Sequence, residues 1–297
     1  MEFCVGGSIK NFARSWCADG KYVRQLDDGS SEDDSDVISS SDSVSDCHEH
    51  FNPMTLNPVK VASLCVGMIE CLDDVFRAKK SLVHRDIKPD NFLVRVDPAS
   101  KKCTVVLADL GLAKIQDTIR SSTTSVSFAT LEEEESISSS KSKQKSTCGT
   151  LAYSALESLM EGDQSQMSDA YSLGMSIIAL FLGHDPYKDN KALELQFDSG
   201  KYAFTLSQLI KDGFTPLIER TSLFKSLLSI DHGEYSIVHS RLNQIVKGLT
   251  RVQKHDRMSV HEARKMIEPI SSLLPPLGEG WKYPNIEEFV KKHRKLK

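Results

Sequence analysis

The part of the sequence that most constrains the fold is a polar octapeptide, H-R-D-I-K-P-D-N at positions 84–91, called the polar turn below. It follows a segment, 61–76, whose apolar residues recur at helical spacing. It precedes two short strand-forming runs, 92–96 and 104–108, which are joined by the turn-forming sequence D-P-A-S and predict a β-hairpin.

The remainder of the chain predicts helices. Segment 169–182 is apolar on most sides, which is typical of a buried helix, and segment 241–249 has one apolar face. Ser259 and Glu262 form a capping-box sequence before another amphipathic helix that is expected to end at about Ile270. We therefore predict a mostly α fold with a small β-hairpin.

Two low-complexity segments interrupt these periodic patterns. The segments at about 27–50 and 118–147 are rich in Ser and acidic residues, and they contain few apolar side chains. Such segments bury too little apolar area to offset the loss of chain entropy on folding. We expect both to be disordered insertions.

The composition restricts the setting in which the chain works. The seven cysteines are scattered and include no C-x-x-C pair, which favours reduced thiols inside a cell. The longest apolar run, 177–182, is too short to cross a bilayer. The formal net charge of −4 argues against a nucleic-acid partner. We predict an intracellular protein, cytoplasmic or nuclear, without a membrane or nucleic-acid partner.

The polar turn matches H-R-D-x-x-x-x-N, the catalytic loop of protein kinases, at every specified position. The sequence D-L-G at 109–111 stands where kinases carry D-F-G. The segment 148–157 resembles the end of a kinase activation segment, with Leu156 where Pro is usual. Isolated loop residues of these types are more often solvated surface groups, but a match of this length disfavours that alternative. The chain resembles the protein kinase family, and Lys88 and Thr150 indicate its Ser/Thr-specific branch.

The resemblance implies a site for ATP and Mg²⁺. Asp86 would accept the proton of the attacking hydroxyl, Lys88 would place an ammonium beside the transferred phosphoryl group, and Thr150 would bond both. Asn91 and Asp109 would be the metal ligands. For the nucleotide, the resemblance adds Leu93 as the floor under adenine and the backbone of Glu2 and Cys4 as hinge contacts, besides Lys88.

Six further residues would have structural roles: His84, Arg85, Gly111, Glu157, Asp169 and Arg257. Glu157 is expected to pair with Arg257, although the two could be unrelated surface charges. Asp169 would bond the backbone of the polar turn, and Gly111 would let the chain turn after Asp109. Leu110, in place of Phe, is expected to keep the apolar packing of that position.

The resemblance also implies a partner and a route of regulation. A kinase acts on a protein substrate, and Arg85 beside Asp86 implies a basic pocket that a phosphorylated loop residue could neutralise. Ser146 and Thr147 are the candidate residues for an upstream kinase. The alternative is that they are two among many exposed hydroxyls.

The domain reading places a hinge at 1–8, a kinase C-terminal lobe at 9–270 and a C-terminal tail at 271–297. Met1 falls at the gatekeeper position, and neither G-x-G-x-x-G nor V-A-I-K precedes the polar turn. We expect an N-terminally truncated chain that lacks the β-rich N-terminal lobe and is inactive alone. The alternative is a pseudokinase C-terminal lobe acting as a scaffold. The first reading is favoured by the intact phosphate and metal groups Asp86, Lys88, Asn91 and Asp109.

Overall fold

The computed structural model describes residues 4, 7–17, 56–97, 100, 102–115, 151–194, 196, 198–230 and 233–281. The two predicted insertions and most of the predicted hinge lie outside these residues. Within the described ranges, no helix combines the length and apolar character needed to cross a membrane.

Helices α1 and α2 precede the polar turn in the described part of the chain. Helix α1 (Ile9–Trp16) begins where the Ser8 hydroxyl accepts a hydrogen bond from the backbone N–H of Asn11. Helix α2 (Pro58–Ala78) contains the predicted segment 61–76 and starts three residues earlier. It does so because the side chain of Asn57 caps the first turn and Pro58 occupies the first helical position.

The predicted hairpin is present. Strand β2 (Phe92–Val96) pairs antiparallel with β3 (Cys103–Leu107) in a register that aligns Phe92 with Leu107 and Val96 with Cys103. The second strand is shifted by one residue relative to the prediction. A second sheet, β1 (Leu82–Val83) with β4 (Lys114–Ile115), was not predicted, because two-residue strands are too short to show a sequence period.

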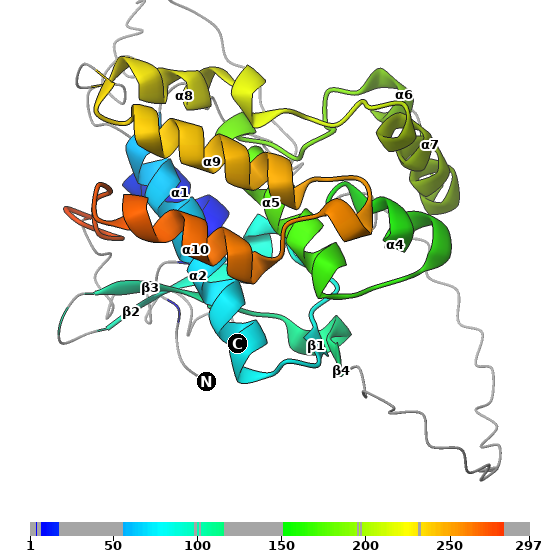
Figure 1. The fold of residues 1–297 in the computed structure, drawn as a ribbon, viewed down its shortest axis with the longest axis horizontal. Coiled ribbons are helices and arrows are strands. Elements are labelled where there is room, and N and C mark those ends of the chain that lie inside the picture. The colour runs from blue at the N-terminus through cyan, green and yellow to red at the C-terminus, as the bar shows by residue number, and fades with distance from the viewer. Residues whose placement is uncertain are drawn as a thin grey trace, which may run out of the picture.

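The C-terminal half is helical, as predicted (Figure 1). Its helices are α4 (Leu156–Glu161), α5 (Gln166–Leu182), α6 (Lys191–Glu194), α7 (Ser199–Lys211), α8 (Ser222–Lys225), α9 (Ser236–Leu249) and α10 (Val260–Ser271). The Ser259–Glu262 capping box starts α10.

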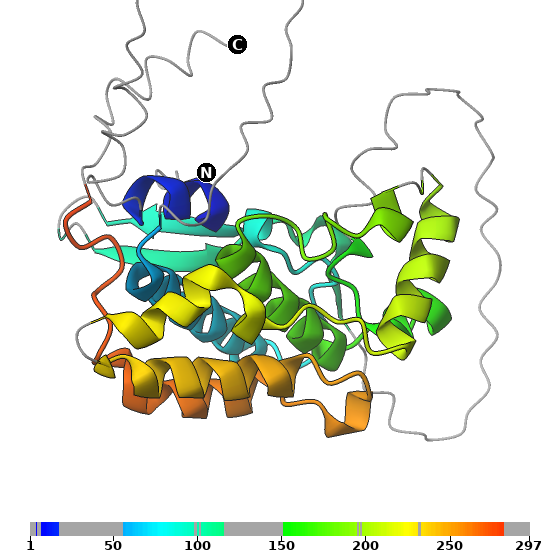
Figure 2. The same ribbon diagram turned by 90° about the horizontal axis from the view of Figure 1, so that it is seen from above.

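The elements form layers around α2 and α5. These two helices lie between the β2–β3 hairpin with α1 on one side and α9 with α10 on the other (Figure 2). Helix α5 is the central element, and most of its side chains are buried. It approaches α9 closely at Gly174, where an added Cβ would lie 2.7 Å from Thr250 Cγ2. The helix that was predicted for residues 169–182 is therefore the central helix of the described structure.

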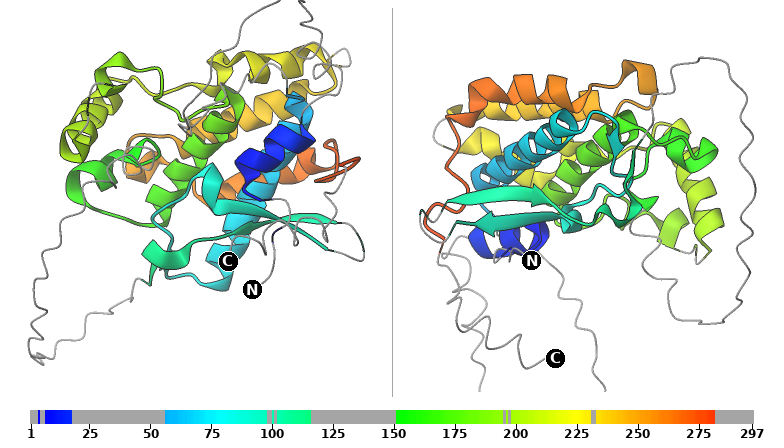
Figure 3. Two further views of the ribbon diagram at one scale, coloured as in Figure 1. Left: turned by 180° about the vertical axis from the view of Figure 1, so that it is seen from behind. Right: turned by 90° about the horizontal axis from the view of Figure 1, so that it is seen from below.

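The chain after α10 folds back onto α1 and the hairpin (Figure 3). The Trp16 indole donates a hydrogen bond to the carbonyl oxygen of Glu279 over 2.9 Å. The Trp281 ring meets Phe12 edge to face, with ring centroids 4.7 Å apart. The first residues of the predicted tail are thus packed against the domain core.

Candidate active site

The polar turn leaves β1, runs through a 3-10 helix (Pro89–Asn91) and enters β2. Its start is held by Asp169, in the first turn of α5, whose carboxylate accepts hydrogen bonds from the backbone N–H groups of His84 (2.7 Å) and Arg85 (2.9 Å). Burial raises the pKa of the Asp169 carboxyl above its usual value, although these two hydrogen bonds oppose that effect. Asp169 therefore ties the polar turn to the central helix.

His84 joins the polar turn to the end of β3. Its imidazole is fully buried, and Nε2 lies 3.0 Å from the carbonyl oxygen of Ala108. Because a carbonyl oxygen can only accept, Nε2 must carry the proton. The N–H of Ala108 in turn donates to the carbonyl oxygen of Asn91 over 2.8 Å. These contacts keep the residue after Ala108, Asp109, beside the polar turn.

The side chains of Asp86, Lys88 and Asn91 are in direct contact. Asp86 Oδ2 accepts hydrogen bonds from Asn91 Nδ2 (2.8 Å) and Lys88 Nζ (2.9 Å). Asn91 Nδ2 also donates to the Asp86 carbonyl oxygen over 2.7 Å. Asp86 Oδ1 is buried and has no hydrogen-bond partner in the part of the chain that the structure describes. A buried acceptor left unpaired is costly, so this oxygen is ready for an external donor.

The donor types of Asn91 and Asp109 fit a magnesium ion. Both N–H bonds of the Asn91 amide point to Asp86, which leaves the amide oxygen as the group that could ligate a cation. Asp109 has a left-handed backbone, with φ of 59°. Its carboxylate is exposed and, among the residues that the structure describes, accepts one long hydrogen bond, from Gly111 N–H (3.3 Å). Oxygen ligands of this kind are those that Mg²⁺ prefers.

The segment that follows Asp109 corrects one expectation. Leu110 was expected to keep apolar packing, but its side chain is 57% exposed, and that of Leu112 is 56% exposed. Both belong to a 3-10 helix (Leu110–Leu112) that runs along the surface of the described residues. At Gly111 an added Cβ would lie 3.1 Å from Asp109 Oδ1, and its predicted role in the turn stays a prediction.

The predicted floor of the nucleotide site borders the described part of the predicted hinge. Ser8 forms a β-bridge with Leu93, and Val94 N–H donates to the Gly7 carbonyl oxygen over 2.9 Å. Gly7 N–H donates in turn to the carbonyl oxygen of Cys4, also over 2.9 Å. Gly7 and Ser8 therefore lie alongside β2 at Leu93, and the Cys4 carbonyl oxygen is bonded to Gly7.

Glu157 and Arg257 form a bidentate ion pair, so the alternative of unrelated surface charges is wrong. The two N···O distances are 2.6 and 3.0 Å, and the Arg257 side chain is fully buried. The guanidinium also donates to the carbonyl oxygens of Met167, Arg251 and Val252. Burial opposes ionisation of Glu157, but Arg257 outweighs it, and the pKa of this carboxyl lies below its usual value. The pair joins α4 to the segment before α10.

Four predicted site residues, Glu2, Ser146, Thr147 and Thr150, lie outside the described residues. Arg85 is exposed and donates to the side chain of Gln164. Its predicted phosphate-binding role stays a prediction.

Sequence reasoning also missed a contact next to the polar turn. The Tyr153 hydroxyl donates to Asp185 over 2.7 Å. The two residues lie 32 positions apart, and although Tyr153 belongs to the segment 148–157, nothing in that segment indicates a contact with Asp185.

The family model described as the protein kinase domain matches residues 39–267, which is more than half of the chain. The chain belongs to the protein kinase family.

Several Ser/Thr kinases are similar to part of it. Serine/threonine-protein kinase PknL of Mycobacterium tuberculosis is 28% identical over 138 residues, 46% of this chain and 28% of that protein. PknF of the same species is 27% identical over 155 residues, 52% of this chain and 28% of that protein. Serine/threonine-protein kinase RAD53 of Saccharomyces cerevisiae is 28% identical over 173 residues, 54% of this chain and 18% of that protein. The chain thus aligns with less than a third of the length of these relatives.

Proposed function

We propose that this chain carries the catalytic region of a Ser/Thr protein kinase, which transfers the γ-phosphate of ATP to Ser or Thr hydroxyls of a protein substrate. The observation that carries the proposal is the state of the Asp86 carboxylate. One oxygen is held by Lys88 and Asn91, and the other is buried and without a partner among the described residues. The similar mycobacterial and yeast proteins are named as Ser/Thr kinases, which agrees with this class.

In the proposed reaction, the substrate hydroxyl donates a hydrogen bond to Asp86 Oδ1 and its oxygen attacks the γ-phosphorus. The new P–O bond forms as the bond to the β,γ-bridging oxygen breaks, ADP leaves, and the hydroxyl proton passes to Asp86. Lys88 holds its ammonium 2.9 Å from Asp86 Oδ2, where it would stabilise charge on the transferred group. Thr150 is assigned, from the family resemblance, to bond Asp86 and Lys88.

Asn91 and Asp109 would hold Mg²⁺, which when bound neutralises phosphate charge. Leu93 would contact adenine from below, and the backbone at Glu2 and Cys4 would bind its edge. Two contacts support a rigid site. Asp169 holds the start of the polar turn, and Glu157 with Arg257 fixes the segment that follows Thr150.

The test separates nucleotide binding from turnover. Thermal-shift titration with ATP and Mg²⁺ should stabilise the chain, and Asp109→Asn should remove the Mg²⁺-dependent part of that shift. Asp86→Asn should retain the shift, and it should lower any phosphotransfer that the unchanged chain shows to a Ser/Thr protein substrate, measured with radiolabelled ATP, by about 10²–10⁴-fold. Asp212→Asn, at an exposed position beyond α7, is the matched control and should change neither quantity.

Two outcomes of the same measurements would contradict the proposal. If ATP with Mg²⁺ gives no stabilisation at any concentration, the scaffold alternative explains the fold better. If phosphotransfer occurs and Asp86→Asn leaves its rate unchanged, the role assigned to Asp86 is wrong.

A further inference from the structure

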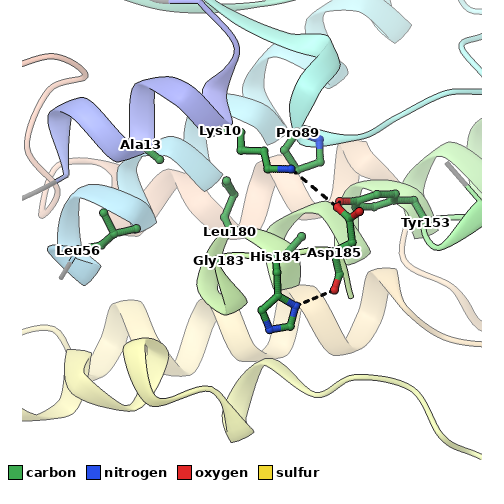
Figure 4. Close-up of a pocket in the computed structure, with 10 residues that line it drawn as sticks. Lys10, Ala13, Leu56, Pro89, Tyr153, Leu180, Gly183, His184 and Asp185 are labelled. Carbon is green, nitrogen blue, oxygen red and sulfur yellow. Dashed lines mark hydrogen bonds and ion pairs between the residues drawn. The ribbon is translucent and has the colours of Figure 1, made fainter. Parts of the chain in front are cut away.

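A cavity lies where the C-terminal end of α2 meets the first turns of α5 and α10, and its volume is about 190 Å³. The cavity beside Lys10, Tyr153 and Asp185 is far smaller, about 20 Å³, which is room for about one water molecule (Figure 4). An apolar cavity of about 150 Å³ can hold benzene. The larger cavity therefore has room for a small organic ligand.

One wall of this cavity carries a buried carboxylate, that of Asp73 in α2. Its side chain is only 2% exposed, and Oδ1 lies 3.3 Å from Nδ1 of His261 in α10. Oδ2 is buried and has no hydrogen-bond partner among the residues that the structure describes. Arg77 Nη1 lies 4.0 Å from Oδ2, which is the outer limit of an ion pair. A buried acceptor without a partner is costly, so Oδ2 favours a ligand that brings a hydrogen-bond donor.

Two cationic side chains border the same cavity, and both are exposed to solvent. Arg77 is 67% exposed, and Lys80 follows just after the end of α2. His261 is also mostly exposed, so rotation of Arg77 and His261 would open Oδ2 to the cavity. The cavity thus combines one buried acidic group with two exposed basic groups.

Three apolar side chains, those of Phe76, Met167 and Val260, line the cavity as well. Phe76 and Val260 are buried, so their positions are set by the packing of α2 and α10. Gln166 fixes the wall formed by α5, because its Nε2 donates to the carbonyl oxygens of Lys80 (3.0 Å) and Leu82 (2.9 Å). The apolar surface and the charged groups are therefore held together by three helices.

We propose that this cavity binds a free α-amino acid with an apolar side chain. The ammonium group donates to Asp73 Oδ2, and the carboxylate pairs with Arg77 and Lys80. Both contacts are charge-assisted hydrogen bonds, which are the stronger kind. The apolar side chain covers the apolar wall. A ligand with a single charge would leave one set of these groups without a partner, so a zwitterion matches the cavity better. None of these residues is assigned to the reaction, so the site does not depend on the proposed function.

The experiment measures binding of L-leucine to the full chain by isothermal titration calorimetry, beside two compounds that each carry one of its charges. Isoamylamine has the same branched body without the carboxylate, and isocaproate has it without the amine. Leucine should bind, and each of the other two compounds should bind at least about tenfold more weakly. Leucine should also raise the Tm of the chain, because it binds the folded state.

Two variants assign the two charges of the ligand to their partners. Asp73→Asn should weaken binding of leucine and isoamylamine about tenfold and should not weaken binding of isocaproate. Arg77→Gln, at a mostly exposed position, should weaken binding of leucine and isocaproate and leave that of isoamylamine unchanged. Damage to the fold would not produce these opposite selectivities. The matched controls are Asp74→Asn and Lys79→Gln, since both are exposed neighbours outside the lining of the cavity, and they should change none of the three affinities.

Four outcomes overturn the site. The first is no binding of leucine at millimolar concentration, and the second is equal affinity for leucine and both singly charged compounds. The third is an affinity for leucine that Asp73→Asn and Arg77→Gln leave intact. The fourth is binding of phosphoethanolamine as tight as that of leucine, because this compound carries the two charges without an apolar body and the amino-acid assignment would then fail. If Asp73→Asn does not fold, the comparison of the three compounds in the unchanged chain and in Arg77→Gln decides.

Discussion

Two carboxylates of the candidate site are partnered in opposite ways. Both oxygens of Glu157 meet Arg257, and that guanidinium also reaches backbone carbonyl oxygens. Asp86 has one oxygen bound and one buried without a described partner. A fully bonded buried pair makes the fold depend on both members, whereas an unpaired oxygen weakens the fold and favours binding of a donor. The arrangement of Glu157 suits a structural role, and that of Asp86 suits binding of a substrate hydroxyl.

The Glu157–Arg257 pair predicts how stability depends on pH. The pKa of Glu157 in the folded state lies below its unfolded value of about 4.3, so its ionisation adds stability above that pH. This stability is lost as the pH falls through the folded pKa. Glu157→Gln leaves Arg257 buried without its counter-charge and should lower the free energy of unfolding by about 3–5 kcal/mol near pH 7. The difference from wild type should shrink on acidification, measured by urea unfolding across acid pH.

The control is Glu219→Gln. Glu219 also has a lowered pKa, through hydrogen bonding to Lys247, but this pair lies at the surface. Its loss should change stability far less than the loss of Glu157. Parallel stability curves for wild type and Glu157→Gln over the whole acid range would contradict the role given to the buried pair.

At the scale of elements, sequence reasoning predicted the helices and strands whose pattern lies within one continuous segment. Apolar spacing predicted α2, the Ser259–Glu262 pair predicted the start of α10, and the strand runs predicted the hairpin. The polar turn brings Asp86, Lys88 and Asn91 together because they are near neighbours in sequence.

Sequence reasoning missed the features that depend on contacts between residues far apart in the sequence. Gly67 lets β3 approach α2, because an added Cβ would lie 2.8 Å from Val105 Cγ2. The Tyr153–Asp185 contact and the β1–β4 sheet are likewise visible only in three dimensions. The Glu157–Arg257 pair could be expected only through family resemblance, since the two residues lie 100 positions apart.

The crossing of α5 and α9 gives a prediction for these elements. Gly174→Ala would place a Cβ 2.7 Å from Thr250 Cγ2 and 3.0 Å from Leu249 Cβ. The gain in helix propensity, about 1 kcal/mol, is opposed by an overpacking cost of about 1–3 kcal/mol. We expect a net loss of stability, measured as a lower Tm. Thr250→Ser removes the closest atom and keeps the hydroxyl that bonds the Val246 carbonyl oxygen. It should therefore restore part of the loss, and a more stable Gly174→Ala variant would disprove the close approach.

On the scale of the whole molecule, residues 272–281 pack against α1, α2 and β3. Leu274 is buried, and Leu277 packs against the core beside Gly67 of α2. Trp281 covers Phe12 of α1, and the Glu279 carbonyl oxygen accepts from Trp16. The segment thereby joins α1 to α2 and β3, and α1 follows directly on the chain that lies alongside Leu93. What the sequence marked as a tail contributes to holding α1 in place.

Substituting two glycines of residues 272–281 by Ala can distinguish the cost of backbone strain from the cost of a close contact. Gly278 and Gly280 both have positive φ, 76° and 71°, so Ala at either position should cost about 1 kcal/mol in backbone strain. At Gly278 the added Cβ would also lie 2.3 Å from Cys103 Sγ, whereas at Gly280 it would meet nothing within 4 Å. Gly278→Ala should therefore lower the free energy of unfolding by about 1–3 kcal/mol more than Gly280→Ala. Cys103→Ala removes the clashing sulfur, so in that background the difference between the two substitutions should narrow in urea unfolding. Equal losses for both glycine variants in the unchanged chain would mean that residues 272–281 do not pack on β3.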